Sequence, residues 1–308
     1  MLSVVICTYN RSEVLSVCLE TIAAYYPKNY TVEVIVVNNN SSDDTEHIVQ
    51  QVQKNNPWVQ LVNESKQGLS HARNLGFQTA TQSWILYLDD DAKIDKNLFN
   101  RVHHLITSSE YRCIGGLYLP WYAVEKPRWF RDKWASNKMQ YHELSTLKRT
   151  EYACGGIMLI QKFLLEEHDG FNSDFGMKGN HLHYGEETDL QQRIRKTGEK
   201  IAYDPFLIIY HRVSPHKMNV KWLLGSSYTM GQTFLLSTGY PNNMFTGFVG
   251  LFIALFQSLI HLLIYLPLLL KKGYFIENYI VDVFKKPAKW LGVFTGSWRG
   301  KGYTHLSD

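Results

Sequence analysis

The first ninety residues alternate between short apolar runs and segments in which apolar residues recur every three or four positions. Continuous apolar runs of this length predict buried strands, and the wider spacing predicts amphipathic helices. Strands are expected over 2–9, 31–40, 59–64 and 83–89, and helices over 11–26, 42–55 and 69–80. Strands of this kind that alternate with helices are typical of a parallel sheet covered by helices on both faces.

The second half of the chain has a more mixed pattern. Further strands are expected over 112–120, 152–161 and 201–212, and a helix with an acidic start and a basic end over 183–198. An aromatic-rich insertion, "WYAVEKPRWFRDKW", separates the first two of these strands. The expected fold class is therefore α/β, with a mixed, mainly parallel sheet.

Residues 245–270 form an apolar segment of 26 residues without a charged side chain, which is long enough to span a bilayer. Its less apolar residues recur at steps of three and four, so they share one helix face that is expected to contact another helix. These residues are Gly247, Gly250, Ala254, Gln257, Ser258, His261 and Tyr265. Pro267 is expected to bend or end the helix. The alternative is a core helix of a soluble domain.

Positive charge gathers after this segment. Residues 271–308 carry seven Lys and Arg against three Asp and Glu, whereas residues 1–270 are neutral. A single span from a cytoplasmic domain would place these lysines outside, against the positive-inside rule. A monotopic or re-entrant helix at the cytoplasmic face of the membrane is therefore favoured, and a single span is the alternative. The neutral body offers no basic face for nucleic acid, which is not an expected partner.

Polar residues follow the four predicted strands of the first half. They are Thr8–Arg11, Asn38–Asn40, Glu64 and Asp89–Asp91. In parallel sheets, ligands bind outside the carboxyl ends of the strands, so these residues are expected to share one site. Three adjacent carboxylates repel one another, and a divalent cation would relieve that repulsion. Mg²⁺ and Mn²⁺ both prefer oxygen ligands of this kind.

Six motifs, in this order along the chain, give it a resemblance to the family 2 glycosyltransferases. They are "VVICTYNR", "VIVVNNNSSDDT", "KQGLSHARNLGF", "LYLDDDA", "ACGGIMLIQK…GFN" and "GEETDLQQRIRKTG". The resemblance covers about residues 2–212 and implies an inverting enzyme with the GT-A fold. It also implies a domain at 1–215, with a nucleotide-binding half at 1–112 and an acceptor-binding half at 113–215. A C-terminal helical region, 216–308, then carries the apolar segment and the basic tail.

The resemblance also implies roles for particular residues. Thr8, Tyr9, Arg11 and Asn39 would line the base and ribose, with Arg73 near the diphosphate. Asp89 and Asp91 would bind the metal with His211 as a further ligand, and Asp90 would face sugar or solvent on the nucleotide side. Glu187 would be the catalytic base, and Glu186 would contact acceptor or sugar. Many members of the family have Asp where this chain has Asn38 and Asn39. Gly155 and Gly156 would let the backbone approach the sugar.

The expected function is a metal-dependent glycosyltransferase that uses Mn²⁺ or Mg²⁺. Its donor would be a nucleoside diphosphate sugar, expected to be UDP-linked. Its acceptor would be a membrane-associated, lipid-linked saccharide in the synthesis of cell-surface polysaccharide or glycolipid. A nucleotidyltransferase is one alternative, although "CTYNRSEV" lacks the glycine-rich loop that such enzymes carry after their first strand. A catalytically inactive membrane scaffold of the same fold is the other.

Overall fold

The computed structural model of the protein describes residues 1–177, 179, 184–238 and 244–299. Its contacts divide the chain into two compact units. The first contains Met1–Trp121, Ala135–His181 and Glu186–Arg212, and the second contains Tyr122–Trp134 and the chain from Val213 onward. Tyr122–Trp134, which was expected in the acceptor-binding half, thus belongs to the second unit, called here the helical unit.

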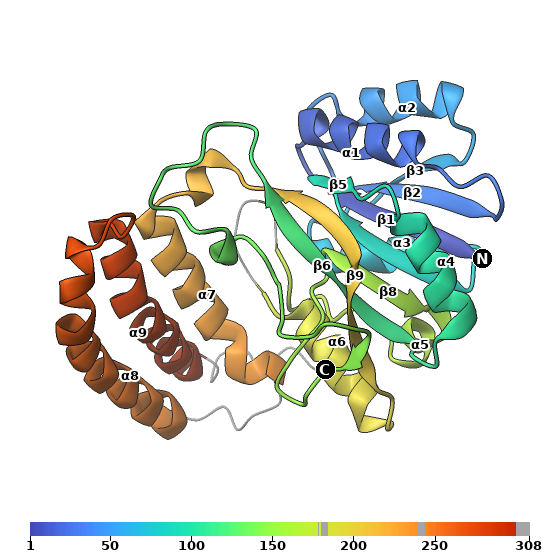
Figure 1. The fold of residues 1–308 in the computed structure, drawn as a ribbon. Helices are drawn as coiled ribbons and strands as arrows, with labels where there is room; N and C mark the ends of the chain where they lie inside the picture. Colours follow the sequence, from blue (N-terminus) through green and yellow to red (C-terminus); the bar gives the residue numbers. More distant parts are fainter. Residues whose placement is uncertain (178, 180–183, 239–243, 300–308) are drawn as a thin grey trace. The chain divides into compact units, whose positions relative to one another are not determined.

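Four parallel strands of the first unit form the half of the sheet that was expected from the apolar runs (Figure 1). In the order β3-β2-β1-β4 they are Val59–Asn63, Val32–Asn38, Leu2–Thr8 and Trp84–Asp89. The helices between them are α1 (Ser12–Ala24), α2 (Thr45–Asn55) and α3 (Leu69–Thr79). The parallel register pairs Thr8 with Asn38 and Cys7 with Asp89, so the strand ends meet at one edge.

The sheet continues with strands from the second half of the chain in the order β8-β6-β9-β5. These are Ile157–Gln161, Cys113–Trp121, Ile201–Arg212 and Ala92–Ile94, and β7 (Ser145–Thr146) pairs with β9. The strand expected over 152–161 begins only at Ile157, because Gly155 and Gly156 lie in a turn. The two shortest strands, β5 and β7, are too short for an apolar pattern and were not expected.

Helices cover both faces of this sheet, which confirms the expected α/β fold. Side chains on alternate positions of a strand point to opposite faces, so Val4 and Val5 belong to different cores. The first core is packed by α1, α2 and α4 (Leu98–Ser108). The second is packed by α3, α5 (Lys162–Glu167) and α6 (Glu186–Lys196). All four cysteines are free.

Three long helices dominate the helical unit: α7 (Val220–Thr238), α8 (Met244–Tyr265) and α9 (Ile276–Arg299). The 3₁₀ turns are η1 (Asp132–Trp134), η2 (Pro215–Lys217) and η3 (Leu266–Leu270), which contains Pro267 where α8 ends. On α8 the residues Gly247, Gly250, Ala254 and Ser258 are buried, so the small-residue face contacts another helix as expected. That neighbour is α9, whose Trp290 ring lies against Gly250.

The contact between α7 and α9 is made by glycines. A Cβ atom added to Gly231 of α7 would lie 2.0 Å from the carbonyl oxygen of Lys289. One added to Gly292 of α9 would lie 1.9 Å from the carbonyl oxygen of Tyr228. Gly296 is equally crowded, at 2.4 Å from the Gln232 carbonyl. The two backbones therefore approach so closely that no side chain fits between them.

Candidate active site

The three aspartates stand where β4 ends and β5 begins, and the pairing of β5 with β9 decides what lies opposite them. Ala92 of β5 pairs with His211 of β9, and the Arg212 N–H donates to the Asp91 carbonyl at 3.0 Å. The indole N–H of Trp121 donates to the same carbonyl at 3.4 Å. As a result, His211 Nε2 lies 3.1 Å from Asp91 Oδ1 and 3.7 Å from Asp89 Oδ2.

Asp89, Asp91 and His211 have the geometry of metal ligands. One ligand atom from each lies within 4.8 Å of the others. Around an ion with bonds of about 2.1 Å, octahedral ligands stand about 3 Å apart when adjacent and about 4 Å apart when opposite. The donor set of two carboxylates and an imidazole suits Mn²⁺, and its oxygens also suit Mg²⁺. The structure therefore brings together the three ligands named from the sequence.

Arg11 supplies positive charge to the other side of the aspartates. Its Nη1 atom donates to Asp90 Oδ1 at 2.8 Å and to Asp91 Oδ2 at 3.1 Å. Asp90 is only 4% exposed, so it does not face solvent. Burial raises the pKa of Asp90 to about 6, although Arg11 opposes the rise. The Arg11 guanidinium was expected to line the base and ribose; it is bound to carboxylates because these buried charges need a partner.

Asn39 was also expected to line the base and ribose. Its side-chain amide donates to the carbonyls of Glu64 and Lys66, and its Oδ1 accepts from the Gly68 N–H at 2.8 Å. Asn39 is 4% exposed, and these hydrogen bonds hold the loop after β3 in place. Thr8 and Tyr9 do lie at the end of β1, with Thr8 buried and Tyr9 half-buried.

Arg73 of α3 forms a buried ion pair with the first acid of α6. Its Nη1 atom donates to Glu186 Oε1 at 2.8 Å, and both side chains are at most 7% exposed. The guanidinium also lies 5.3 Å from the centre of the Phe171 ring. Arg73 was expected near the diphosphate. In the structure its guanidinium forms an ion pair with Glu186. A buried arginine needs such a partner, and no pattern along the chain indicated that the partner would be Glu186.

Glu187 follows in the first turn of α6. Burial raises the pKa of Glu187 to about 8, the negative charge of Glu186 adds to the rise, and Arg73 opposes it. A carboxylic acid that titrates near neutral pH can take up a proton and release it during turnover. Glu187 remains the predicted general base, and its raised pKa is consistent with that prediction.

Gly155 and Gly156 lie next to both the Asp89 carboxylate and the Arg73 guanidinium. A Cβ atom on Gly156 would lie 2.3 Å from Asp89 Oδ2, and one on Gly155 would lie 2.7 Å from Arg73 Nη2. The close approach expected at these glycines is therefore made by Asp89 and Arg73. The adjacent glycines were visible in the sequence, but the side chains that need the space were not.

Changing Gly156 to alanine is expected to weaken metal-dependent nucleotide binding at least tenfold, because the added methyl group would displace the Asp89 carboxylate. A ligand misplaced by about 1 Å is enough for a loss of this size. Isothermal titration with nucleotide and Mn²⁺ measures it. Gly225→Ala is the matched control, since a Cβ atom there meets nothing within 4 Å. Unchanged binding in Gly156→Ala would show that Asp89 is not a ligand.

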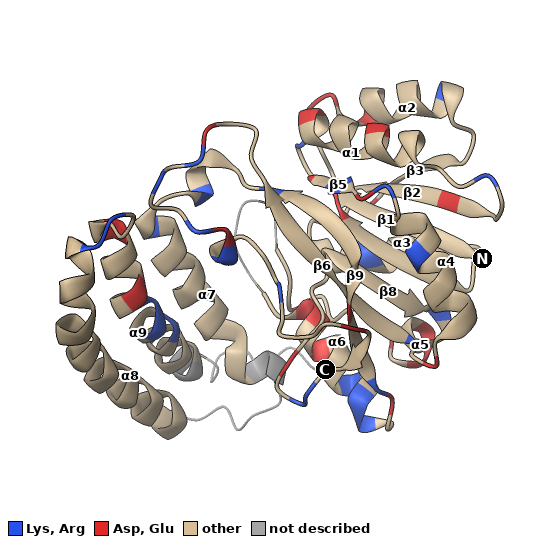
Figure 2. Ribbon diagram, in the orientation of Figure 1, with Lys and Arg blue, Asp and Glu red and all other residues tan. Residues whose placement is uncertain are grey.

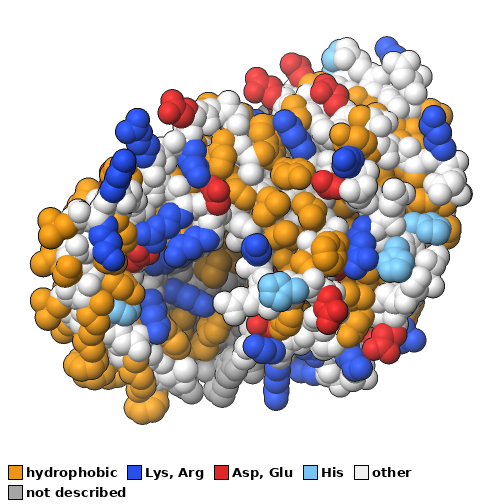
Figure 3. Space-filling model, in the orientation of Figure 1, with side chains coloured by type: hydrophobic (Ala, Val, Ile, Leu, Met, Phe, Trp, Pro, Cys, Tyr) orange, Lys and Arg blue, Asp and Glu red, His pale blue; other side chains and the backbone are white. Residues whose placement is uncertain are grey.

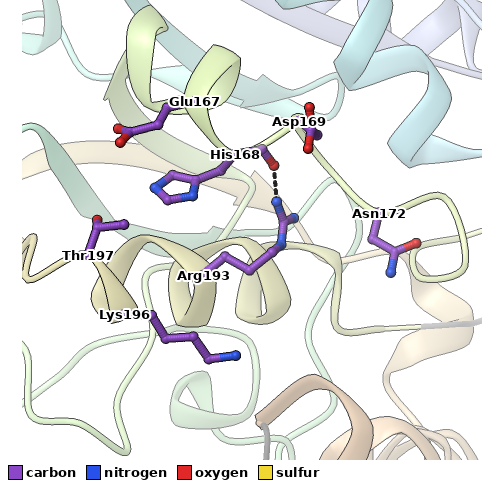
Figure 4. Close-up of a pocket in the computed structure, with 7 residues that line it drawn as sticks. All are labelled: Glu167, His168, Asp169, Asn172, Arg193, Lys196 and Thr197. Atoms are coloured by element: carbon purple, nitrogen blue, oxygen red, sulfur yellow. Dashed lines mark hydrogen bonds between the residues drawn. The ribbon is translucent and has the colours of Figure 1, made fainter.

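A separate pocket lies between α5 and α6 (Figure 4). Its lining residues are Glu167, His168, Asp169, Asn172, Arg193, Lys196 and Thr197. Arg193 donates to the carbonyls of His168 and Gly170 and pairs with Asp189, so it fastens the end of α5 to α6. None of the residues predicted from the sequence lines this pocket.

Comparison with known proteins identifies the family of the chain. The family model described as glycosyl transferase family 2 matches residues 3–169. The glucosyl-dolichyl phosphate glucuronosyltransferase of Haloferax volcanii is 23% identical over 239 residues, which are 74% of each chain. The succinoglycan biosynthesis protein ExoM of Rhizobium meliloti is 22% identical over 237 residues, which are 74% of this chain and 72% of ExoM.

Solved structures show the same fold. The mannosyltransferase PcManGT from Pyrobaculum calidifontis, solved in complex with GDP-Man and Mn²⁺, superposes with a TM-score of 0.59 at 16% identity. The match covers 98% of this chain and 75% of PcManGT. With more than half of its length matched by the family model, the chain is a GT-A glycosyltransferase that belongs to glycosyl transferase family 2.

Proposed function

We propose that the protein transfers a sugar, with inversion, from a UDP-linked donor to a hydroxyl group of a lipid-linked saccharide at the cytoplasmic face of a membrane. The observation that carries this proposal is the placement of the acidic pair relative to the metal ligands. Gly155 lies against Arg73, which forms an ion pair with Glu186. The adjacent Gly156 lies against Asp89. The Asp89 carboxylate and the ion pair of Arg73 with Glu186 therefore both lie against one backbone turn, which supports a metal ion and a base acting in the same site.

In this reaction the acceptor oxygen attacks the anomeric carbon and forms the new glycosidic bond. The bond between that carbon and the diphosphate oxygen breaks with its electron pair, and the nucleoside diphosphate leaves. Glu187 accepts the proton of the acceptor hydroxyl, and Glu186, held by Arg73, contacts acceptor or sugar. Asp89, Asp91 and His211 would hold Mn²⁺ or Mg²⁺, which supplies positive charge for the departing diphosphate.

The nature of donor and acceptor is supported by the relatives. The acceptor named for the Haloferax enzyme is a sugar on dolichyl phosphate, which is a lipid-linked saccharide. ExoM is named for the synthesis of succinoglycan, a polysaccharide. UDP is proposed from the family resemblance, and GDP is its competitor because PcManGT was solved with GDP-Man.

Calorimetry with UDP, GDP, dTDP and CDP tests the proposal. Each nucleotide is titrated into the full chain with Mn²⁺, with Mg²⁺ and with EDTA. Tight binding of UDP that requires a metal ion supports the proposal, and sugars are then screened on that nucleotide. Tight binding of GDP instead would indicate a GDP-linked donor and leave the proposed reaction class unchanged. Absence of metal-dependent binding for all four nucleotides would overturn the enzymatic proposal.

A further inference from the structure

The outer face of α8 is an exposed apolar surface. Met244–Leu270 is a single apolar stretch with a hydropathy of 2.1, and only 11% of its most apolar 18-residue window is buried. Hydrophobic side chains cover this helix at the left of Figure 3. The most exposed of them are Phe245, Phe248, Phe252, Phe256, Leu259, Leu263, Ile264 and Leu270, each more than half exposed. A contiguous surface of this kind marks a contact with a membrane or a protein.

The charges of α9 lie beside the middle of α8. The two helices are antiparallel: Gly250 packs on Trp290, and Tyr279 donates its hydroxyl proton to the Leu262 carbonyl at 2.8 Å. Between these contacts, α9 carries Asp282, Lys285, Lys286 and Lys289. Lys286 Nζ reaches Gln257 Oε1 of α8 at 2.5 Å. Figure 2 shows α8 free of charged residues and α9 with red and blue segments along its length.

The segment Tyr122–Trp134, most of which is irregular, is bound to the same part of α9. Arg131 binds both carboxylate oxygens of Asp282, at 2.8 and 3.0 Å. Asn278 Nδ2 donates to the Trp129 carbonyl at 2.6 Å. Irregular backbone and ion pairs are not tolerated where they would meet lipid hydrocarbon. If α8 crossed a bilayer, its partner α9 and the segment Tyr122–Trp134 would be drawn into the hydrocarbon with it.

We propose that the helical unit is a monotopic anchor, in which α8 lies in the plane of one leaflet of an anionic bilayer. The outer face of α8 enters the lipid, and the charged residues of α9 remain on the aqueous side. Phe284 and Leu291 of α9 are also exposed, by 40% and 43%. This arrangement buries the apolar face without burying any of the four charges.

The charge of the helical unit fits an anionic lipid surface. All of its Lys, Arg, Asp and Glu lie in residues 122–134 and 213–308, which carry 13 Lys and Arg against 5 Asp and Glu. The rest of the chain carries 19 Lys and Arg against 23 Asp and Glu, so only the helical unit has a net positive charge. Lys271 and Lys272 follow directly after the apolar stretch, where headgroups would stand. Basic residues beside an inserted apolar face strengthen binding to anionic lipid.

Vesicle binding tests the surface, and it does not depend on sugar transfer, so it can succeed or fail separately from the proposed function. The full chain is sedimented with vesicles of phosphatidylcholine alone and with about one third phosphatidylglycerol. Binding to the anionic vesicles is expected to fall at least about tenfold in Phe252→Gln/Leu259→Gln/Leu263→Gln. It is expected to fall about fivefold for each of Lys271→Gln and Lys272→Gln.

Phe163→Gln/Phe206→Gln is the matched control, because these exposed side chains belong to the other unit. Its binding should equal that of the wild type. Light scattering of each variant without lipid measures its molar mass, and so detects a dimer or aggregates of misfolded protein. A stable dimer that fails to bind vesicles, and that the triple variant converts to monomer, would overturn the proposal in favour of self-association.

Labelling distinguishes a flat helix from a crossing one. Met244→Cys and Lys272→Cys place a thiol at each end of the apolar stretch, and the wild type gives the background of its own cysteines. Both variants, bound to the outside of sealed vesicles, are expected to react with a membrane-impermeant maleimide without detergent. Protection of one end until detergent is added would show that α8 crosses the bilayer, which would overturn the monotopic anchor.

Discussion

Replacing Glu187 with glutamine is expected to lower kcat by about 10²–10⁴-fold, the range typical for loss of a general base. Metal-dependent nucleotide binding should stay within about twofold, because the amide has nearly the same shape and no metal ligand changes. Rates are measured with saturating donor and lipid-linked acceptor, and binding is measured by calorimetry. A Glu187→Gln enzyme with the wild-type kcat would exclude Glu187 as the base.

The same residue gives a pH dependence of defined sign. Only the deprotonated carboxylate accepts a proton, and the pKa of Glu187 is raised to about 8. The kcat of the wild type should therefore rise about tenfold per pH unit below pH 8 and level off above it. Glu186→Gln removes a neighbouring negative charge, so it should move this limb to lower pH. A limb that stays at the same pH in Glu186→Gln would assign it to another group.

Stability should change in the opposite direction with pH. The raised pKa means that the fold favours protonated Glu187, and this contribution is complete at low pH and lost as the pH rises through about 8. Glutamine mimics the protonated acid at every pH. The Tm of Glu187→Gln should therefore match that of the wild type near pH 4 and exceed it increasingly from pH 5 to 9.

Replacing Asp91 with asparagine is expected to weaken nucleotide binding in Mn²⁺ by at least about 100-fold, while binding in EDTA is unchanged. Asp91 is 3% exposed and contacts both Arg11 and His211, so the amide removes a metal ligand and also breaks the ion pair with Arg11. Calorimetry with and without metal separates the two effects.

Asp174→Asn, which changes an exposed carboxylate, is the control for this experiment. Circular dichroism and thermal denaturation establish that Asp91→Asn is folded under the conditions of the titration. Retention of metal-dependent binding in a folded Asp91→Asn protein would place the metal elsewhere in the chain.

The parallel half of the sheet was predictable because its information is local. The runs that became β1 and β4 are mainly apolar, and parallel pairing then required Thr8, Asn38 and Asp89 to meet at one edge. Asp89, Asp91 and His211 were predicted together as metal ligands from the family resemblance, and the structure brings these three side chains close to one another. The position of His211 relative to them depends on β5, which is three residues long and carries no recognisable pattern.

The partners of buried charged groups were not predictable. Arg11 and Arg73 were each expected to face the nucleotide, and each is bound to a carboxylate of the protein. The separation of Arg73 from Glu186 is 113 residues, so no local rule connects them. The backbone partners of Asn39 were unpredictable for a related reason: an amide can bind a base or a backbone, and only the fold decides which groups lie near it.

The glycine contact between α7 and α9 provides a way to recognise related helical units in other sequences. Exposed positions on the outer face of α8 need only be apolar if this face contacts lipid as proposed, so leucine, phenylalanine and isoleucine can replace one another there during evolution. Gly231, Gly292 and Gly296 have no such substitutes, because even a methyl group would overlap the opposite backbone. A glycine in one helix and a Gly-x-x-x-Gly pair in the helix after the apolar stretch should therefore persist after overall identity has disappeared.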